Sequence, residues 1–279
     1  MSDFSAAWLD LREPVDHRSR NRKLERALAK HFDGWRPVTV VDLGCGTGSN
    51  LRATAPLLGP EQHWTLVDRD ERLLDAAAAR LAAWADGADR REGRLALFKG
   101  AKRINVAFRR ADLAGDLEAA LGPNANLATA SALFDLVSAE FIARFAAAIA
   151  ARKSAFYAVL TYDGDQRWTP EDEADAGLLE AFHAHQRRDK GFGPAAGPDA
   201  PDALSEAFSR LGYAVSEGDS AWRLGSGDGP LIAELASGFA QAARETGQVD
   251  AQTIAAWRAI ARTGTVVGHT DTLAVPPVG

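Results

Sequence analysis

Three acidic residues and a glycine-rich loop are the parts of this sequence best suited to holding a small polar ligand. The loop runs from Asp42 to Gly48 and reads DLGCGTG. Glycine lets a ligand approach the backbone closely, and the amide groups that begin a following helix attract anionic groups. Asp68 and Asp112 each follow a short apolar run, and a carboxylate there can accept hydrogen bonds from hydroxyl or amino groups. This chemistry fits several nucleotide-like cofactors.

The spacing of the glycines separates these cofactors. A dinucleotide site needs G-x-G-x-x-G, and here Gly44 and Gly46 fill the first two positions whereas Ser49 stands at the third. The phosphate-loop pattern G-x-x-x-x-G-K-[ST] does not occur in the chain. The sequence therefore disfavours both NAD and a phosphate-loop nucleotide.

The pattern Asp42-x-Gly44-x-Gly46-x-Gly48 resembles the first motif of class I S-adenosylmethionine-dependent methyltransferases, over roughly residues 38–161. The resemblance implies S-adenosylmethionine as methyl donor and S-adenosylhomocysteine as product. It further implies that the loop lies against the methionine and ribose, and that Asp42 reaches the methionine amino group through water. By the same resemblance, Asp68 binds the ribose hydroxyls, while Asp112 meets the adenine amino group.

Two flanking segments, residues 8–14 and 185–194, resemble segments of bacterial methyltransferases. N-terminal helices in such enzymes often close over the cofactor, so Arg12 is a candidate partner for the methionine carboxylate. A surface arginine on an amphipathic helix is the alternative. We interpret Cys45 as a small packing residue. The predicted cofactor-binding residues are Arg12, Asp42, Gly44, Cys45, Gly46, Gly48, Asp68, Arg69, Asp112 and Leu113.

Methyl transfer from a sulfonium is an in-line displacement, so the protein mainly has to align the reacting groups. A hydroxyl or amine acceptor also calls for a base, and histidine suits one near neutral pH. His183 and His185 are two residues apart and cannot face one site from a helix, and we prefer His185 because it adjoins a glycine-rich turn. Asp135 is the second catalytic candidate, since this family commonly places residues near the transferred methyl after the fourth strand. The predicted substrate residues are Ser131, Tyr162, Asp163 and His183. For His269 we favour a core role.

Strands and helices alternate along the chain and would position these residues. Apolar runs at 38–41, 64–67, 104–108, 127–133 and 155–161 predict buried strands, with helices between them. Two more strands are expected at 213–216 and 266–275. Such alternation predicts an α/β fold, a doubly wound, mostly parallel seven-stranded sheet of the Rossmann-like methyltransferase type.

The predicted organisation has four parts. Residues 1–36 form an N-terminal helical cap, 37–162 the cofactor-binding core, and 202–279 the C-terminal part of the same domain. Between them, residues 163–201 are acidic, then helical, then rich in glycine and proline. A segment this long is usually functional, so we expect a lid over the substrate.

Composition limits the function classes. The net charge of -6 disfavours bulk attraction to nucleic acid or to a membrane. One cysteine excludes an internal disulfide and CxxC metal sites, and no residue cluster suggests a metal, so we expect metal-independent chemistry. No signal-peptide pattern and no run of roughly 18 apolar residues occurs, which favours a cytoplasmic monomer or homodimer.

The predicted function is methyl transfer to a small-molecule acceptor, with two alternatives. Residues 90–110 contain eight basic residues against one acid, Glu92, as an RNA-binding patch would. We favour a solvated loop there, because only two aromatic residues interleave with the charges. The other alternative is a non-catalytic S-adenosylmethionine-binding protein.

Overall fold

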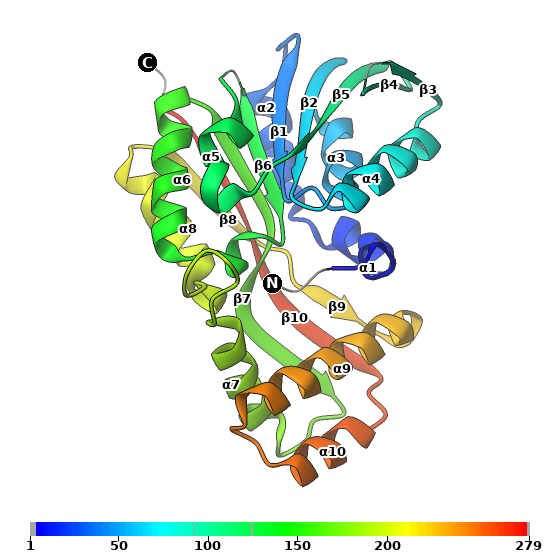
Figure 1. Ribbon diagram of the computed structural model, residues 1–279, viewed down its shortest axis with the longest axis vertical. Helices are drawn as coiled ribbons and strands as arrows, with labels where there is room; N and C mark the ends of the chain where they lie inside the picture. Colours follow the sequence, from blue (N-terminus) through cyan, green and yellow to red (C-terminus); the bar gives the residue numbers. More distant parts are fainter. Residues whose placement is uncertain (1–3, 92, 124, 278–279) are drawn as a thin grey trace.

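One sheet runs through the centre of the molecule (Figure 1). The computed structural model describes residues 4–91, 93–123 and 125–277. Five strands of the sheet pair in parallel: β5 (Lys102–Arg110), β2 (Glu61–Asp68), β1 (Val38–Leu43), β6 (Leu127–Ser131) and β7 (Ala155–Thr169). The chain builds outward from β1 on one side and then from β6 on the other. The strand order therefore reverses beside β1, and a ligand is expected at the carboxyl ends of the strands at this point.

Antiparallel strands extend both edges of the parallel core. Beyond β5 lies a hairpin of β3 (Gly87–Arg91) and β4 (Arg94–Lys99). Beyond β7 lies β10 (Gly264–Val275), which pairs with both β8 (Ala214–Asp219) and β9 (Trp222–Leu224). The doubly wound parallel core is confirmed, but the described part of the chain forms ten strands where seven were expected. Residues 90–91 and 94–99 belong to these two strands, so the loop predicted there is wrong.

Helices cover both faces of the sheet, and each face has its own apolar cluster. One cluster includes side chains of α2 (Arg22–His31), α3 (Ser49–Thr54) and α4 (Glu71–Trp84). The other includes side chains of α5 (Leu113–Leu121), α6 (Ala139–Arg152) and α8 (Ala200–Arg210). In α6 the Ser138 hydroxyl caps the helix by accepting from the Phe141 amide at 3.1 Å.

The antiparallel pair β7 and β10 continues beyond the core as a ribbon that carries a second lobe (Figure 1). Around the ribbon lie α7 (Asp175–Gln186), α9 (Gly229–Thr246) and α10 (Ala251–Ala259). The rings of Phe182 and Phe239 stack at 4.0 Å, and Trp168 meets Phe239 and Trp257 edge-on. The region expected as a lid, residues 163–201, thus begins inside β7. Its helix α7 packs against α9, which was expected to belong to the C-terminal part of the core domain.

Helix α1 (Ala6–Ser19) lies between the sheet core and this lobe (Figure 1). Ser5 caps it by accepting from the Trp8 amide at 3.1 Å, and Arg52 of α3 binds Glu13 at 2.5 Å. The predicted N-terminal helical segment is therefore attached to α3, the helix that follows the glycine loop. No helix in the described ranges is long and apolar enough to cross a membrane.

Candidate functional site

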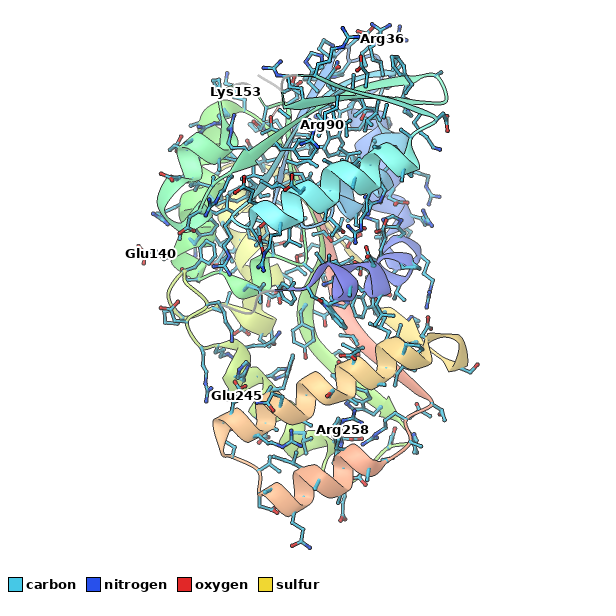
Figure 2. All side chains as sticks on the ribbon, turned by 45° about the vertical axis from the view of Figure 1, so that its right-hand side comes forward. Arg36, Arg90, Glu140, Lys153, Glu245 and Arg258 are labelled. Atoms are coloured by element: carbon cyan, nitrogen blue, oxygen red, sulfur yellow. The ribbon has the colours of Figure 1, made fainter. Side chains whose placement is uncertain are left out.

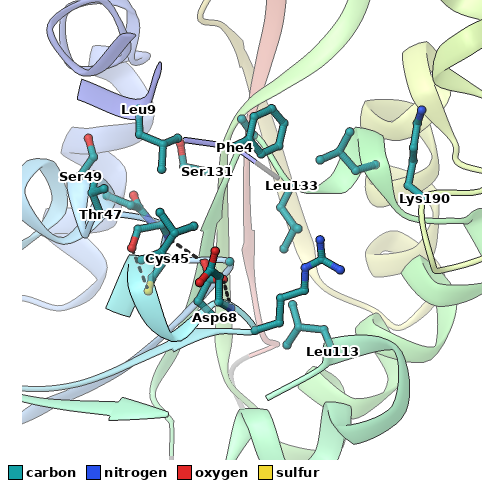
Figure 3. Close-up of a pocket in the computed structure, with 18 of the residues that line it drawn as sticks. Phe4, Leu9, Cys45, Thr47, Ser49, Asp68, Leu113, Ser131, Leu133 and Lys190 are labelled. Carbon is teal, nitrogen blue, oxygen red and sulfur yellow. Dashed lines mark hydrogen bonds between the residues drawn. The ribbon is translucent and has the colours of Figure 1, made fainter. Parts of the chain in front are cut away.

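A pocket lies at the carboxyl ends of β1, β2 and β6, beside the reversal in strand order (Figure 3). It holds about 1280 Å³ of space, part of which is open to solvent. Nine of the residues around it were predicted from the sequence, and apolar side chains of α1 and α5 close its sides. The predicted residues that line it are Arg12, Gly44, Cys45, Gly46, Asp68, Arg69, Asp112, Leu113 and Ser131.

The glycine loop is bent sharply where it borders the pocket. Gly44, Gly46 and Gly48 have φ of 62°, 52° and 77°, a region that favours glycine. A side chain on Gly46 would place its Cβ 2.9 Å from Leu9 Cδ1, so α1 rests directly on the loop. Gly48 faces Leu81 of α4 and does not line the pocket. The loop therefore offers bare backbone at Gly44 and Gly46, whereas Gly48 serves helix packing.

Asp68 stands at the end of β2 with its carboxylate on the pocket wall. Its Oδ2 accepts from the Gly46 amide and its Oδ1 from the Asp70 amide, both at 3.0 Å. Burial raises the pKa of this carboxyl, and hydrogen bonds from the backbone amides of Asp70, Gly46 and Arg69 act in the opposite direction. A carboxylate has about four acceptor positions, so the side chain is fixed in place and can still accept from a ligand.

Asp112 follows β5 and begins α5. It caps that helix by accepting from the Ala114 amide at 3.2 Å, and it also lines the pocket with Leu113 and Arg69. Asp112 therefore both caps α5 and lines the pocket. Leu113 offers an apolar surface there, and Asp112 offers a carboxylate beside it.

Asp42 lies beneath the loop and does not line the pocket. Its Oδ1 accepts from Asn50 Nδ2 at 2.7 Å, while Oδ2 has no hydrogen-bond partner among the described residues. Burial raises the pKa of this carboxyl to about 7, against the hydrogen bond from Asn50 and the charge of Arg20. Asn50 itself lines the pocket and also receives a hydrogen bond from Arg20 at 2.5 Å. Any effect of Asp42 on a ligand therefore passes through Asn50.

Arg12 of α1 reaches into the pocket. Its Nε donates to Asp16 Oδ2 at 2.9 Å, and its guanidinium lies 5.0 Å from the ring centroid of Trp222. The side chain is 11% exposed, so Arg12 is a pocket residue and not the solvated surface arginine of the alternative interpretation. Its terminal nitrogens point to no partner within the described residues.

Of the predicted substrate and catalytic residues, Ser131 alone lines the pocket. Asp135 is buried behind the pocket wall formed by Leu133 and Leu136, and burial raises its pKa to about 6. Tyr162 and His183 share a hydrogen bond of 3.0 Å, and burial raises the pKa of the Tyr162 hydroxyl. Asp163 accepts from Thr270 Oγ1 at 3.4 Å and lies outside the pocket lining.

His185 does not reach the pocket. Its Nε2 contacts Glu245 Oε2 of α9 at 2.8 Å, within the second lobe, where Figure 2 labels Glu245. The reason is the face of α7 on which it stands, because that face packs against α9. The preference for His185 as the base is therefore wrong on placement, and the adjoining glycine-rich turn supplies Lys190 and Phe192 to the pocket instead.

Several pocket residues escaped the sequence analysis. Phe4 and Leu9 come from the N-terminal segment, Asn50 follows the glycine loop, and Lys190 and Phe192 come from the predicted lid. The glycine and proline content of the predicted lid indicated a functional segment, but nothing in its sequence showed which side chains line the pocket. Cys45 lines the pocket, and burial raises the pKa of its thiol, which suits a packing residue. Within the described residues, no group of three or more His, Cys, Asp or Glu side chains is placed to hold a metal ion.

Solved structures provide the comparison for this chain, since neither a family model nor a curated protein matches it. A proposed methyltransferase from Bacillus halodurans aligns with a TM-score of 0.52 and 11% identity, over 91% of this chain and 99% of that one. A cyclopropane-fatty-acyl-phospholipid synthase-like protein from Lactobacillus casei gives 0.52 and 13%, over 98% and 95%. The YcgJ protein from Bacillus subtilis gives 0.50 and 13%, over 92% and 100%. At these identities the likeness concerns the fold. The chain has the fold of the class I methyltransferases.

Proposed function

We propose that this protein transfers a methyl group from S-adenosylmethionine to a small-molecule acceptor. One observation carries the proposal: the glycine loop, Asp68 and Asp112 stand at the ends of three neighbouring strands and line a single pocket. Arg12 enters the same pocket from α1. A fold alone does not give a function, so the proposal depends on this site.

The groups around the pocket match the separate parts of S-adenosylmethionine. The Asp68 carboxylate on the pocket wall can accept from a ribose hydroxyl, and Leu113 with Asp112 offers an apolar wall beside an acceptor for the adenine. Gly44 and Gly46 leave room for the methionine portion, and the Arg12 guanidinium matches a carboxylate. A side chain at Gly46 would fill the cradle that Leu9 closes.

The bound cofactor supplies a methyl group on a positively charged sulfur, which an acceptor displaces in line. The residues of the chain then have two tasks, to align the acceptor and to exclude water. Leu9, Leu133 and Phe192 surround the pocket with apolar surface, and α1 covers the loop. Such an enclosure strengthens the electrostatic interactions of the polar groups inside.

A small acceptor is favoured over RNA by the contacts of the basic segment at residues 90–110. Five of its eight basic side chains contact partners in the fold through ion pairs or backbone carbonyls. They are Arg91, Lys99, Lys102, Arg109 and Arg110. The hairpin of β3 and β4 is also at the edge of the sheet beyond β5, whereas the pocket is at the strand ends. The basic side chains of the hairpin therefore lie apart from the pocket, whereas Arg110, at the end of β5, adjoins the pocket residue Ala111.

Equilibrium dialysis with labelled S-adenosylmethionine tests the proposal. We expect saturable binding, displacement by S-adenosylhomocysteine, and no displacement by NAD at the same concentration, because the third glycine of the dinucleotide pattern is missing. Absence of binding, or equal displacement by NAD, would remove the proposal. Retained binding of a labelled single-stranded RNA at low salt would favour the RNA alternative for the acceptor.

A further inference from the structure

Two residues that line the pocket each carry a buried oxygen with no hydrogen-bond partner among the described residues. The oxygens are Asp16 Oδ1 on α1 and Thr47 Oγ1 in the glycine loop, and their residues are 7% and 1% exposed. Buried polar groups usually have partners, because an unpaired one has lost its contacts with water and gained nothing in return. Since both residues border the pocket, a ligand bound there can supply the missing donors.

Asp16 forms a buried ion pair with Arg12, which lines the pocket as well. Arg12 Nε donates to Asp16 Oδ2 at 2.9 Å, and the two side chains are 11% and 10% exposed. Burial raises the pKa of Asp16, and the charge of Arg12 acts in the opposite direction. The bond uses one guanidinium nitrogen and one carboxylate oxygen. The pocket wall therefore holds a cation and an anion side by side, and both can form further hydrogen bonds.

Helix α1 crosses the glycine loop close to these atoms. His17, the residue after Asp16, contacts Ser49 Oγ through its Nε2 at 2.9 Å. Figure 3 shows Thr47 beside Ser49, across the pocket from Leu113. The ion pair and the Thr47 hydroxyl therefore belong to the loop side of the pocket, where the proposed function places the methionine portion of the cofactor.

Of the acidic residues that line the pocket in the described part of the chain, Asp16 is the one without an assigned role. The proposed function matches Asp68 to the ribose and Asp112 to the adenine, and Asp70 pairs with Arg72 at 2.8 Å. A carboxylate on the loop side is thus left for a cationic group of the ligand.

The Asn50 amide on the same side of the pocket has no hydrogen-bonding position left for a ligand. Its Nδ2 donates to Asp42 at 2.7 Å and to Thr129 at 3.1 Å. Its Oδ1 accepts from Arg20 at 2.5 Å and from Thr54 at 3.2 Å. Two donors and two acceptor positions are all that an amide side chain offers. Asn50 therefore does not compete with Asp16 for an ammonium group.

We propose that Asp16, held by Arg12, binds the ammonium group of the methionine portion of the cofactor, with Thr47 as a second acceptor. This inference rests on the proposed function. The methionine portion is a zwitterion, so its carboxylate on Arg12 and its ammonium on Asp16 would make the four charges alternate. Helix α1 then recognises the whole amino-acid end, and Asp16 takes the amino group that the family resemblance gives to Asp42.

Asp16→Asn tests the contact, because asparagine keeps the shape and an oxygen for Arg12 but loses the negative charge. Calorimetry on the full chain compares three ligands: S-adenosylhomocysteine, its deaminated analogue and its decarboxylated analogue. We expect the variant to weaken S-adenosylhomocysteine and the decarboxylated analogue by about ten- to 150-fold. The deaminated analogue has no ammonium to lose, so its affinity should fall by less than about twofold, which also shows that the variant is folded.

Two further variants complete the experiment. Thr47→Val keeps the shape of the side chain without its hydroxyl, leaves α1 intact, and should weaken the same two ligands by about two- to tenfold. Asp10→Asn, at an exposed carboxylate of α1 that pairs with Arg80, is the matched control and should bind all three ligands as wild type does.

Equal losses for S-adenosylhomocysteine and its deaminated analogue in Asp16→Asn would overturn the ammonium contact and mean that Asp16 acts only by orienting Arg12. Unchanged affinity for all three ligands in Asp16→Asn and Thr47→Val would also overturn it, with fixed water satisfying both oxygens. Failure of wild type to bind S-adenosylhomocysteine is a different result, and it would reject the proposed function itself.

Discussion

Asp42 and Asp68 lie near the ends of neighbouring strands, but Asp42 is fully buried whereas Asp68 lines the pocket. Asp68 presents its carboxylate to the pocket, while Asp42 is covered and holds Asn50, which lines the pocket in its place. The family resemblance implies that the loop acid reaches the methionine amino group through water. In this chain Asp42 is covered and accepts from Asn50, so we expect Asp42 to act by positioning Asn50.

Replacement of Asp68 tests the ribose contact. Asp68→Ala removes the acceptors for two hydroxyls and also releases the Gly46 amide that Asp68 holds at 3.0 Å. Hydrogen bonds to a charged group contribute about 1.5–3 kcal/mol, so we expect affinity for S-adenosylhomocysteine to fall by about ten- to 150-fold in calorimetry. Glu71→Gln, at an exposed residue in the first turn of the next helix, is the control and should bind as wild type does. Unchanged affinity in Asp68→Ala would exclude Asp68 from the site.

Asp42 should make the stability of the ligand-free protein depend on pH. Its folded pKa is raised to about 7 from an ordinary value of 3.8. Between these values the unfolded chain ionises more readily than the native state, so the native state loses stability as pH rises, and no further loss follows above the folded pKa. Asp42→Asn cannot ionise and lacks this loss.

Urea unfolding of both proteins at a series of pH values measures the effect. We expect the difference in unfolding free energy to move in favour of Asp42→Asn from about pH 4 to about pH 7, by at most on the order of 4 kcal/mol, and then to level off. A difference that stays constant across this window would show that Asp42 ionises in the native state as it does in the unfolded chain.

At the scale of elements, the site depends on how α1 rests on the glycine loop. Gly46 has φ of 52°, and a Cβ added there would lie 2.9 Å from Leu9 Cδ1, whereas Gly100 has φ of 55° and a Cβ added there would have no atom within 4 Å. The two glycines share a backbone conformation and differ in their surroundings. Substituting each glycine therefore separates the free-energy cost of the backbone conformation from the cost of displacing α1.

Alanine at both positions gives the comparison. Gly100→Ala should lose about 1 kcal/mol of stability from backbone strain alone. Gly46→Ala should lose more and also weaken S-adenosylhomocysteine binding, because Leu9 must shift. Adding Leu9→Ala should recover part of that affinity if the clash is the cause. Equal losses in the two single variants, measured by thermal unfolding and calorimetry, would show that α1 does not press on the loop.

The local sequence was enough to predict the strands that carry the glycine loop and the strand-end acids, but not the full length of β7. The strand-end acids and the glycine loop follow their strands directly, so alternating apolar runs were enough to place them. Residues 163–169 looked like an acidic loop because Asp163 and Asp165 stand among them. In fact Gln166 and Trp168 point inward on β7, and Gln166 hides its polarity by donating to Thr265 Oγ1 at 2.6 Å.

Trp222 and His269 lie far from the motif in sequence, and the pairing of β9 with β10 brings their rings to 5.0 Å from each other. No local pattern indicates such pairing. His269 was correctly expected to be buried, but its position beside Trp222 depends on the whole sheet.

At the scale of the whole molecule, the second lobe has a core of its own. Phe239 of α9 stacks on Phe182 at 4.0 Å and packs against Trp168, away from the cofactor pocket. Phe239→Ala should cost about 3–5 kcal/mol of unfolding free energy through the cavity it leaves. Affinity for S-adenosylhomocysteine should change less than about twofold below the unfolding temperature. Glu234→Ala, at an exposed residue of the same helix, is the control. A parallel fall in cofactor affinity would mean that the lobe and the pocket form one cooperative unit.

A crystal structure with S-adenosylhomocysteine tests the central claim most directly. The account predicts the ribose hydroxyls on Asp68, the adenine beside Asp112 and Leu113, and the amino-acid end between Gly44, Gly46 and Arg12. A ligand bound elsewhere, or one turned so that its adenine occupies the Arg12 end, would contradict it.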